Sequence, residues 1–570
     1  MKNSEIASIF DRMADILEFK GELIFKINAY RKASRVLLEG AEDIEILAAQ
    51  NRLGELPGIG KAIQEKILEY LREKRIAKYE ELLATVPREL FELLSIPNYG
   101  PKTAALAYRE LGIETLQDLK AAIDKGSLRD LPGMGDKKVE KIRQGIELRE
   151  SASERISIGI ALPIVEEVIS YLRATGGDRI LQIAPAGSVR RFRETVHDID
   201  VLVETAVSAE IIRLFTEMPQ VTRILAAGET KGSVLLDDRF QVDLRAVSPG
   251  SFGAALQYFT GSKEHNVRLR ELARKKGLKI NEYGVFAGED KVAGEDEEAL
   301  YAYLGMAWIA PELREDRGEI EAAVAQHLPN LVHLNELLGD LHIHSNQSDG
   351  HLTLEDMAAA VRARGYRYMA FCDHSQSAFY ANGLSSERLQ HSKETIARLN
   401  EKWDDFVVLA GAEVEILADG RLDYSDEILK ELDFVVASIH SGFKSDPTGR
   451  TIAAMQNPYI DLIGHPTGRL ISRRKGLEID LDKVIESAVL TGTALEVNSS
   501  WDRLDLQELH IKNAIEAGAK ICINTDAHDS SQLDQMQFGV ATARRGWATA
   551  KDVINTLSLE RLKKWQKRNR

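Results

Sequence analysis

The sequence predicts a multidomain protein with an all-α N-terminal region, an α+β middle region and a C-terminal distorted β/α barrel. Its 570 residues exceed what one hydrophobic core can hold, so three or more domains are expected. Three glycine turns, each followed by an amphipathic helix pattern, recur before residue 150. Seven short apolar runs separated by helix-length segments follow residue 335, which is the pattern of alternating strands and helices.

The composition indicates a globular protein of a reducing compartment. Hydrophobic residues (44%) and charged residues (29%) are ordinary for a soluble domain, and no stretch approaches the ~20 apolar residues that span a bilayer. The start lacks a signal-peptide pattern, and Cys372 and Cys522 lie in apolar strand runs without a disulfide framework. We therefore expect a cytoplasmic protein with no membrane partner. The net charge of −15 argues only weakly against a polyanionic partner, because basic residues can cluster locally.

Three related segments in the N-terminal region place a tight turn before a helix: LPGIGKAIQEKI (56–67), IPNYGPKTAALA (96–107) and LPGMGDKKVEKI (131–142). Glycine permits the turn, and the helix N-terminus offers free N–H groups and a positive dipole end to a phosphate. A helical domain with glycine turns would explain one copy, but three copies favour DNA. The segments resemble helix-hairpin-helix motifs, although the second departs from the others at Asn98-Tyr99. The predicted DNA contacts in these segments are Gly58, Gly60, Lys61, Gly100, Lys102, Gly133, Gly135 and Lys137.

The segment AGSVRRFRETVHDID (186–200) predicts a site for nucleotidyl transfer. Asp198 and Asp200 are two apart, so on a strand both carboxylates point to one face, and Asp243 lies in another strand-like run. Three such carboxylates can hold two Mg²⁺ or Mn²⁺ ions. A bare D-x-D is common, but the combination with G-S-x-R-R resembles the nucleotidyltransferase superfamily. The expected catalytic metal ligands are Asp198, Asp200 and Asp243, with Gly187, Ser188 and Arg191 as phosphate contacts.

Residues 258–268 (YFTGSKEHNVR) and 281–284 (NEYG) resemble the nucleotide-binding segment of family X DNA polymerases, the group that includes the vertebrate repair polymerase beta. The resemblance implies that this part of the chain binds the incoming nucleotide and the template. Its implied nucleotide contacts are Tyr258 and Phe259 at the sugar, Gly261, Asn266 at the base or minor groove, and Lys263 at the triphosphate; Arg268 would contact the template strand. Vertebrate members carry an acidic residue in place of Lys263.

The N-terminus resembles the small lyase domain of the same family through KINAYRKAS (26–34) and the first hairpin. The resemblance implies that Lys66 forms a Schiff base with a 5′-deoxyribose phosphate and that Lys26 and Tyr30 contact the 5′-phosphate. A second phosphate-binding lysine of the family falls on Ala62 here. Lys66 as an ordinary solvated lysine is the alternative.

Eleven of the 13 histidines follow residue 326, and several lie where a predicted strand ends. Polar residues at the C-terminal ends of barrel strands are typical of an active site. The motifs HIHSNQSDG, DHS, GAEVEI, SIHS, GHP and NTDAH resemble the polymerase-and-histidinol-phosphatase (PHP) domain, a barrel of metal-dependent phosphoesterases. The implied ligands are His342, His344, Asp349, His374, Glu413, His440, His465, Asp526 and His528, enough for up to three Zn²⁺, Mn²⁺ or Fe²⁺ ions.

The resemblance covers nearly the whole chain and implies an order of domains. We expect a lyase-like DNA-binding domain at 1–80, a helix-hairpin-helix subdomain at 81–150, a nucleotidyltransferase palm at 151–250, a nucleotide-selecting thumb at 251–315, a linker at 316–335 and a PHP domain at 336–570.

The function implied is a repair polymerase that fills short gaps, in base excision repair or end joining, fused to a barrel that hydrolyses DNA as an exonuclease, abasic endonuclease or 3′-phosphatase. Gapped or nicked double-stranded DNA and deoxynucleoside triphosphates would be its partners, and a monomer at the nucleoid is expected. Two alternatives remain open at this point. The barrel could act on a small phosphomonoester, or it could only support the polymerase.

Overall fold

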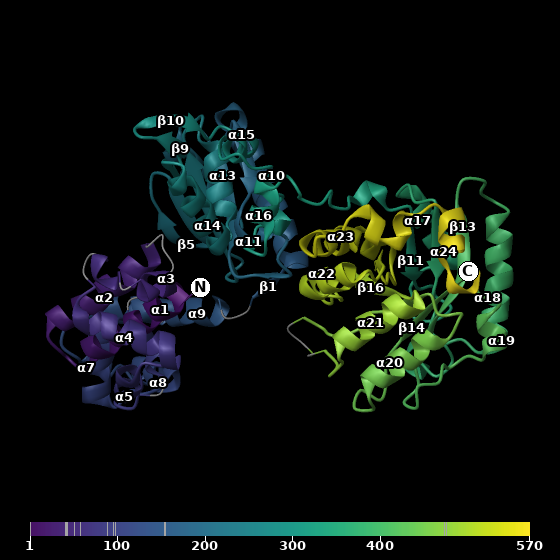
Figure 1. The fold of residues 1–570 in the computed structure, drawn as a ribbon, viewed down its shortest axis with the longest axis horizontal. Coiled ribbons are helices and arrows are strands. Elements are labelled where there is room, and N and C mark those ends of the chain that lie inside the picture. The colour runs from purple at the N-terminus through teal and green to yellow at the C-terminus, as the bar shows by residue number, and fades with distance from the viewer. Residues whose placement is uncertain are drawn as a thin grey trace. The chain divides into compact units, whose positions relative to one another are not determined.

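The computed structural model describes residues 2–39, 44–50, 52–56, 59–87, 89–94, 96, 99–152, 155–471, 474 and 476–569. The chain forms two compact units, Met1–Glu154 and Arg155–Arg570. The elements of each are labelled in Figure 1. Among the described residues, no helix is both long and apolar enough to cross a membrane.

The described residues of the first unit form helices and turns. The helices are α1 (Lys2–Phe19), α2 (Ile24–Glu39), α3 (Ile44–Ala49), α4 (Lys61–Glu73), α5 (Ala77–Leu83), α6 (Leu90–Leu94), α7 (Pro101–Leu111), α8 (Leu116–Asp124) and α9 (Asp136–Ala152). Helix α1 shows why they pack: Ile6, Phe10 and Met13 recur at helical spacing and are all fully buried. The all-α prediction for this region is confirmed.

The second unit begins with a five-stranded mixed sheet in the order β2-β4-β7-β6-β5. The elements of this part of the chain are β1 (Ile156–Ser157), α10 (Ile158–Gly176), β2 (Gln182–Pro185), α11 (Gly187–Arg190), β3 (Thr195–Val196), β4 (Ile199–Glu204), α12 (Ser208–Thr216), β5 (Val221–Ala227), β6 (Lys231–Leu236) and β7 (Phe240–Val247). Strands β1 and β3 pair with each other in a separate two-stranded sheet. Residues of α10 and α12, such as Val165 and Ile211, share a buried cluster with the sheet. Strands β4 and β7 are parallel neighbours, and Asp200 lies opposite Asp243 in their register. The sheet therefore brings two of the predicted ligands together.

A smaller body of helices and a three-stranded antiparallel sheet follows. It contains α13 (Phe252–Thr260), α14 (Lys263–Lys275), β8 (Leu278–Asn281), β9 (Gly284–Ala287), β10 (Asp290–Ala293), α15 (Glu297–Tyr303) and α16 (Glu319–Val324). Residues 316–335, expected to be a linker, contain α16, whose Ile320 and Ala323 are buried in one cluster with Leu300 and Tyr301. Apolar side chains at helical spacing fold this segment onto the same core.

Seven parallel strands form the barrel, each paired with the next along the chain. They are β11 (Gly339–Ile343), β12 (Tyr368–Phe371), β13 (Val407–Glu415), β14 (Phe434–Ser438), β15 (Leu462–Ile463), β16 (Ala494–Asn498) and β17 (Ile521–Asn524). A parallel bridge between Ile343 and Ala527 joins the first strand to the segment after the last. The seven strands match the seven apolar runs of the sequence, so the prediction of a distorted seven-stranded barrel is confirmed.

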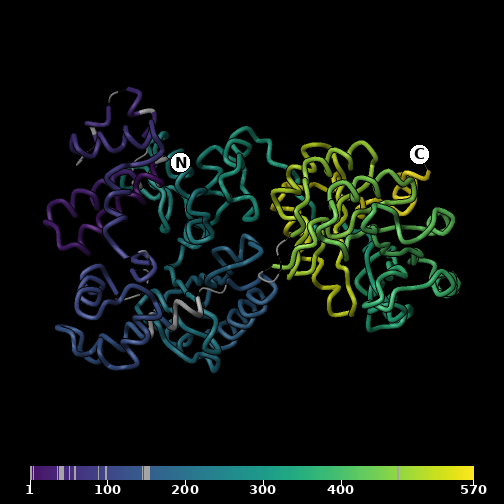
Figure 2. The backbone as a smooth tube through the Cα atoms, turned by 90° about the horizontal axis from the view of Figure 1, so that it is seen from below, coloured from purple at the N-terminus to yellow at the C-terminus, as the bar shows by residue number. Residues whose placement is uncertain are grey.

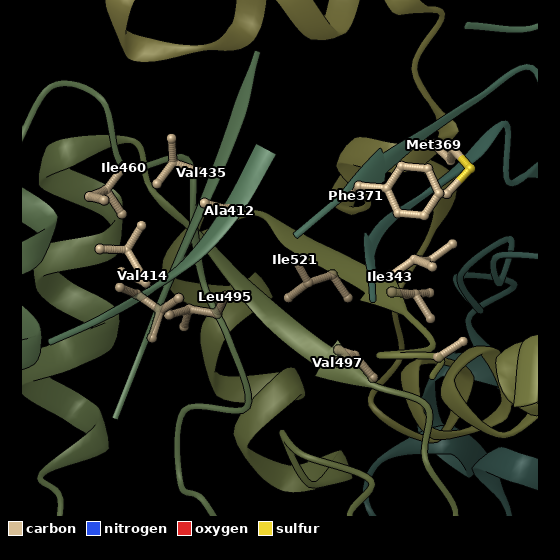
Figure 3. Packing of buried hydrophobic residues seen from close by; sticks show 14 of the residues in the cluster. Ile343, Met369, Phe371, Ala412, Val414, Val435, Ile460, Leu495, Val497 and Ile521 are labelled. Atoms are coloured by element: carbon tan, nitrogen blue, oxygen red, sulfur yellow. The ribbon is translucent and has the colours of Figure 1, made fainter. Parts of the chain in front are cut away.

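Alternation along the strands divides the barrel core into two layers. One layer contains Phe434 and Val436 of β14 with apolar residues of the other strands, such as Leu341, Leu409 and Leu462, on the inside of the barrel. The other contains Val435 of β14 and packs against the surrounding helices. Figure 3 shows part of this outer layer, in which Met369 and Phe371 lie near Ile343.

Helices connect the strands and surround them, as Figure 1 shows. They are α17 (Leu354–Ala363), α18 (Ser386–Asn400), α19 (Asp426–Leu429), α20 (Pro447–Gln456), α21 (Leu481–Thr491), α22 (Glu508–Ala517), α23 (Met536–Arg545) and α24 (Leu559–Trp565). The green-to-yellow part of the tube in Figure 2 winds as one body, with the C-terminus on it.

The five-stranded sheet domain and the barrel are in direct contact within the second unit. Leu504 and Phe538 of the barrel belong to the same buried cluster as α10 and the sheet. Trp501 packs against Gly159 so closely that a Cβ atom at residue 159 would lie 2.2 Å from its ring. Arg469 of the barrel donates to Glu194 across 2.8 Å. Both apolar packing and an ion pair therefore join the two parts.

Candidate active sites

The first candidate site lies at the ends of β4 and β7. Asp198 immediately precedes β4, Asp200 is its second residue, and Asp243 lies opposite Asp200 on β7. The carboxylate oxygens of these three residues lie farther from one another than the donor atoms of the barrel site, which are within 4.8 Å of one another in each group. Asp243 is instead held by Lys231, whose Nζ lies 2.7 Å from its Oδ2, and by a short hydrogen bond from Ser233. Both partners lie on β6, and no sequence motif marks either of them as part of the site.

The electrostatics of this site fit a divalent cation. Burial and the negative charges of Asp198 and Asp243 raise the pKa of Asp200 to about 7. Burial alone would also raise the pKa of Asp243, but hydrogen bonds from Lys231, Ser233 and a neighbouring glutamine outweigh it and lower that pKa. Three carboxylates that repel one another in a partly buried site are the donor set that Mg²⁺ or Mn²⁺ prefers.

The turn before β4 supports this site closely. Gly187 has a φ of +58°, and a Cβ atom there would lie 2.0 Å from Oδ2 of Asp200. Only glycine fits both the backbone angle and the space. Ser188 follows it in α11, so two of the three predicted phosphate contacts lie in the turn that approaches Asp200.

Arg191 is held away from solvent by its own partners. Its Nε donates to Oε1 of Glu315 across 3.0 Å, and its Nη1 forms a short hydrogen bond to the Thr260 carbonyl. The neighbouring Arg190 forms two hydrogen bonds to Glu297, which also binds the fully buried Arg314. These ion pairs connect α11 to the thumb.

The predicted nucleotide-binding residues gather around the junction of α13 and α14. The rings of Tyr258 and Phe259 meet edge to face at 5.1 Å between centroids. Asn266 donates to the Tyr258 carbonyl at 2.7 Å and does not project freely. Lys263 is the exposed first residue of α14, and Gly261 lies in the turn before it with a φ of +69°.

Two further residues of α14 are engaged within the protein. Arg268, the predicted template contact, lies 3.5 Å from Asp316 and also pairs with Glu321. His265, which has no role assigned from the sequence, is fully buried. Its ring nitrogens lie 2.7 Å from Glu319 and 2.9 Å from the Tyr301 hydroxyl. His265 is therefore a structural residue that ties α14 to α16.

In the first unit, the three turn motifs each lead into a helix as expected. Gly60 and Gly100 are the N-caps of α4 and α7, and Gly135 directly precedes α9, with Gly133 at a φ of +76°. Gly58 lies outside the described residues. The predicted lysine contacts Lys61, Lys102 and Lys137 all lie in the first turn of these helices and are exposed.

The predicted lyase residues lie on two helices of the same unit. Lys66 of α4 donates to the Ala62 carbonyl one turn earlier, at 3.2 Å. Lys26 of α2 pairs with Glu22 at 3.0 Å. Tyr30 is half-buried, with its ring 5.7 Å from that of Phe10.

The second candidate site is at the C-terminal ends of the barrel strands. All nine predicted ligands meet here, and they form overlapping groups in which donor atoms lie within 4.8 Å of one another. The groups are His344, Asp349, His374 and His528; His342, His344 and Asp526; and His374, Glu413 and His440. His465 joins them through Nε2, which lies 3.0 Å from Oε1 of Glu413.

The donor atoms of this site fit bound metal ions. His342, His344 and Glu413 are at most 1% exposed, yet their imidazole and carboxylate atoms include several that no hydrogen bond satisfies. Buried polar atoms without partners are costly and rare unless a ligand satisfies them. Mixed imidazole and carboxylate donors suit Zn²⁺, Mn²⁺ or Fe²⁺.

Neighbouring charges set the protonation of these ligands. Burial and the nearby His528 lower the pKa of His344 to about 3, so its ring is neutral and able to bind a metal. Burial would also lower the pKa of His440, but Glu413 and Glu415 raise it to about 10. A divalent cation would replace the proton of His440, so metal affinity should fall as the pH is lowered.

Two carboxylates that sequence reasoning missed orient the ligands. Oε1 of Glu496 lies 2.7 Å from Nδ1 of His342, and Oε2 of Glu415 lies 2.9 Å from Nδ1 of His440. Such partners fix the imidazole that binds the metal. Strand alternation could have found them, because Glu415 is two residues after Glu413 and Glu496 is two after the inward-facing Ala494.

Family models match four parts of the chain: a helix-hairpin-helix domain over residues 1–76, a SAM-like helix-hairpin-helix tandem over 90–149, the DNA polymerase beta thumb over 255–315 and the PHP domain over 340–499. These matches follow the order of domains that the motifs imply.

Curated relatives match both the whole chain and the barrel alone. The DNA polymerase/3′-5′ exonuclease PolX of Bacillus subtilis (strain 168) is 40% identical over 577 residues and covers 100% of both chains. A probable phosphatase of Thermoanaerobacter sp. (strain X514) is 31% identical over 236 residues, which are 39% of this chain and 91% of the relative. One from Caldicellulosiruptor bescii is 30% identical over 214 residues, 35% of this chain and 83% of the relative. The chain therefore belongs to the family X DNA polymerases that carry a C-terminal PHP domain.

Proposed function

We propose that this protein extends DNA primers at the sheet site and removes nucleotides from DNA 3′ ends at the barrel site. One observation carries the proposal: nine buried or half-buried ligands gather in the barrel of a chain that is 40% identical over its full length to a polymerase/3′-5′ exonuclease. Gapped or nicked DNA in repair and deoxynucleoside triphosphates are the proposed substrates, and the turn motifs of the first unit would hold the DNA backbone.

At the sheet site, Asp198, Asp200 and Asp243 would hold two Mg²⁺ or Mn²⁺ ions. Bound ions would assist deprotonation of a primer 3′-hydroxyl and neutralise charge on the triphosphate. Lys231 fixes Asp243, and the close approach of Gly187 fixes Asp200, so two ligands are positioned before substrate binds. Ser188 and Lys263 would contact phosphate oxygens, and the Tyr258–Phe259 pair would lie against the sugar.

At the barrel site, the nine ligands would hold up to three ions of Zn²⁺, Mn²⁺ or Fe²⁺. Bound ions would polarise the scissile phosphate and lower the pKa of an attacking water. Glu413 lies near five histidines and is the residue best placed to be shared between ions. Glu415 and Glu496 keep their histidines in the tautomer that binds a metal.

Lyase activity at Lys66 is a further part of the proposal, supported by the exposed face of α4 and by the match to a helix-hairpin-helix domain. Borohydride reduction of the protein on an incised abasic DNA should trap a covalent complex, and Lys66→Ala should lose it. Arg72→Ala, in the last turn of the same helix, is the control that should keep trapping.

Two double variants test the division of labour. Asp198→Ala/Asp200→Ala should abolish primer extension on a one-nucleotide gap and leave 3′-end removal intact, while His342→Ala/His344→Ala should do the reverse. Each should be assayed with Mg²⁺ and with Mn²⁺. DNA removal that survives the histidine variant would place the nuclease outside the barrel, and joint loss of both activities would indicate that the barrel supports the polymerase.

A second candidate function has a specific observation in its favour. The relatives that match the barrel alone are probable phosphatases. In four of them the match covers 81% to 91% of the relative's length. A barrel phosphatase would release phosphate from a DNA 3′-phosphate or from a small phosphomonoester. Comparing phosphate release from both substrates with nucleotide release from a 3′-hydroxyl end separates these activities.

A further inference from the structure

Two adjacent aromatic residues beside the barrel site are exposed to solvent. Phe379 is 88% exposed, the highest fraction among the large apolar side chains in the described part of the chain, and Tyr380 is 70% exposed. They lie in a short 3₁₀ turn, Phe379–Ala381, between β12 and α18. Exposing two successive aromatic side chains to water is unfavourable unless they contact a ligand.

The turn itself is well held. The Ser377 amide donates to Asp423 across 2.7 Å, and the Leu384 amide donates to the carbonyl of the ligand His374 across 2.8 Å. Asn382 ends the turn in the left-handed region and donates to the Gln347 carbonyl across 3.2 Å. An ordered turn therefore presents the two rings, which lowers the entropy that a ligand would lose on binding them.

Tyr380 also lies at the metal ligands. Its ring centroid is 6.0 Å from that of His374 and 6.3 Å from that of His440. It lines a cleft of about 380 Å³ together with Glu413 and His465, a volume in the range of small-ligand sites.

Two arginines at the same cleft give it the charge that a DNA strand requires. Arg474 and Arg503 both line it, and neither forms an ion pair with a carboxylate among the described residues, although Arg474 donates to the Gly468 carbonyl through Nε and Nη2. The Arg474 guanidinium lies 5.2 Å above the Phe443 ring, which is 40% exposed. Aromatic rings next to cations that no carboxylate neutralises are typical of sites that bind single strands through base stacking and phosphate contacts.

We propose that Phe379 and Tyr380 are the stacking platform for a single-stranded DNA 3′ end, with Tyr380 under the terminal base and Phe379 under the next one. The one phosphate between these two nucleotides is the scissile one and lies at the metal ligands, and Arg503 and Arg474 hold phosphates on its 5′ side. The inference rests on the proposed nuclease function of the barrel and adds the form of its substrate. Because every base has a stacking face, the site accepts any sequence, and duplex ends must fray before they are cut.

A stacking cycle tests this in the full-length protein. Tyr380→Ala is assayed on a single-stranded oligonucleotide with a normal 3′-terminal nucleotide and on one whose terminal nucleotide lacks its base. We expect KM for the normal substrate to rise about tenfold with little change in kcat, and no further loss on the abasic one. Tyr380→Phe should retain the wild-type KM.

Phe379→Ala should likewise raise KM for substrates with several unpaired nucleotides. Leu490→Ala removes an 80% exposed side chain on α21, away from the cleft, and should leave KM unchanged. Equal losses for Tyr380→Ala on both substrates, or no loss on either, would overturn the inference. The histidine double variant keeps the two proposals distinguishable. If it still removes nucleotides, the nuclease function fails; if it is inactive while both aromatic variants cut normally, only the stacking platform fails.

Discussion

At the scale of single residues, each candidate site contains a position whose residue type is determined by a neighbouring side chain of the site. Gly187 is dictated by the carboxylate of Asp200, and Glu496 by the imidazole of His342. Neither residue would contact a reacting atom. Each acts by placing a ligand, so its loss should affect one site and spare the other.

Gly187→Ala should damage the sheet site alone. The new Cβ atom would meet Oδ2 of Asp200 at 2.0 Å, and the φ of +58° would add strain. We expect primer extension to fall about 100-fold, because small displacements of catalytic groups are costly. Gly228→Ala is the control, since its Cβ would make only an ordinary contact at 3.5 Å. Normal primer extension by Gly187→Ala would show that Asp200 can shift without loss of activity, which would contradict the prediction.

Glu496→Gln should weaken metal binding at the barrel. The carboxylate that fixes His342 would become an amide, and loss of such a partner typically lowers metal affinity about 10- to 100-fold. Metal content after dialysis and the Mn²⁺ dependence of 3′-end removal both report the change. Excess Mn²⁺ should restore activity. The exposed Glu486→Gln variant should behave as wild type, and an unchanged Mn²⁺ dependence for Glu496→Gln would refute the positioning role.

At the scale of elements, strand alternation explains how much of the barrel site could be predicted. The period of two that buries Phe434 and Val436 inside the barrel continues to Ser438 and His440, and the same holds from Ala494 to Glu496. Motifs could therefore identify the residues that gather at this site. They could not identify Lys231 at the sheet site, because its approach to an aspartate depends on the pairing of β6 with β7.

The start of α22 and the end of α23 form an ion network that should depend on pH. Burial raises the pKa of Glu508, but Arg545, Arg317 and Arg193 outweigh it and lower that pKa from 4.5 to about 2. A carboxyl with a depressed folded pKa stabilises the fold above its unfolded pKa and loses this contribution as the pH falls toward the folded value. The contribution is at most about 3 to 4 kcal/mol.

Unfolding of the wild type and of Glu508→Gln should therefore differ most at neutral pH. The difference should narrow as the pH falls from 4.5 toward 2, measured by denaturant titration at each pH. Glu516→Gln, at the exposed end of the same helix, should show no such trend. A difference that is constant with pH would mean that the charge of Glu508 does not contribute.

At the scale of the whole molecule, composition and length predict several domains, and motifs predict their order. The segment 316–335 shows where that reasoning stops: its charges and Pro329 resemble a linker, yet Ile320 and Ala323 are buried. Only the structure shows that the apolar side chains of this segment pack against the neighbouring helices. The joint between sheet domain and barrel is equally invisible in the sequence, since Gly159 and Trp501 lie far apart along the chain.

Removing metal should destabilise the barrel more than the rest of the protein. Buried donor atoms such as those of Glu413 and His344 lose their partners when ions leave. A ligand at 100 times its Kd stabilises a fold by about 2.7 kcal/mol. Calorimetry with and without a chelator should show a lower melting temperature for the barrel transition. The His342→Ala/His344→Ala variant should not respond to the chelator, and an equal response would locate the metal elsewhere.

The contact between Trp501 and Gly159 has a consequence for the history of the family. Any side chain at residue 159 would collide with the indole ring, so the two positions constrain each other across a domain boundary. Homologous chains should therefore change them together: where the tryptophan is replaced by a small residue, larger residues become tolerable at position 159. A barrel transplanted from a relative without this tryptophan would leave a gap against α10. We therefore expect the sheet domain and the barrel to be inherited as a matched pair.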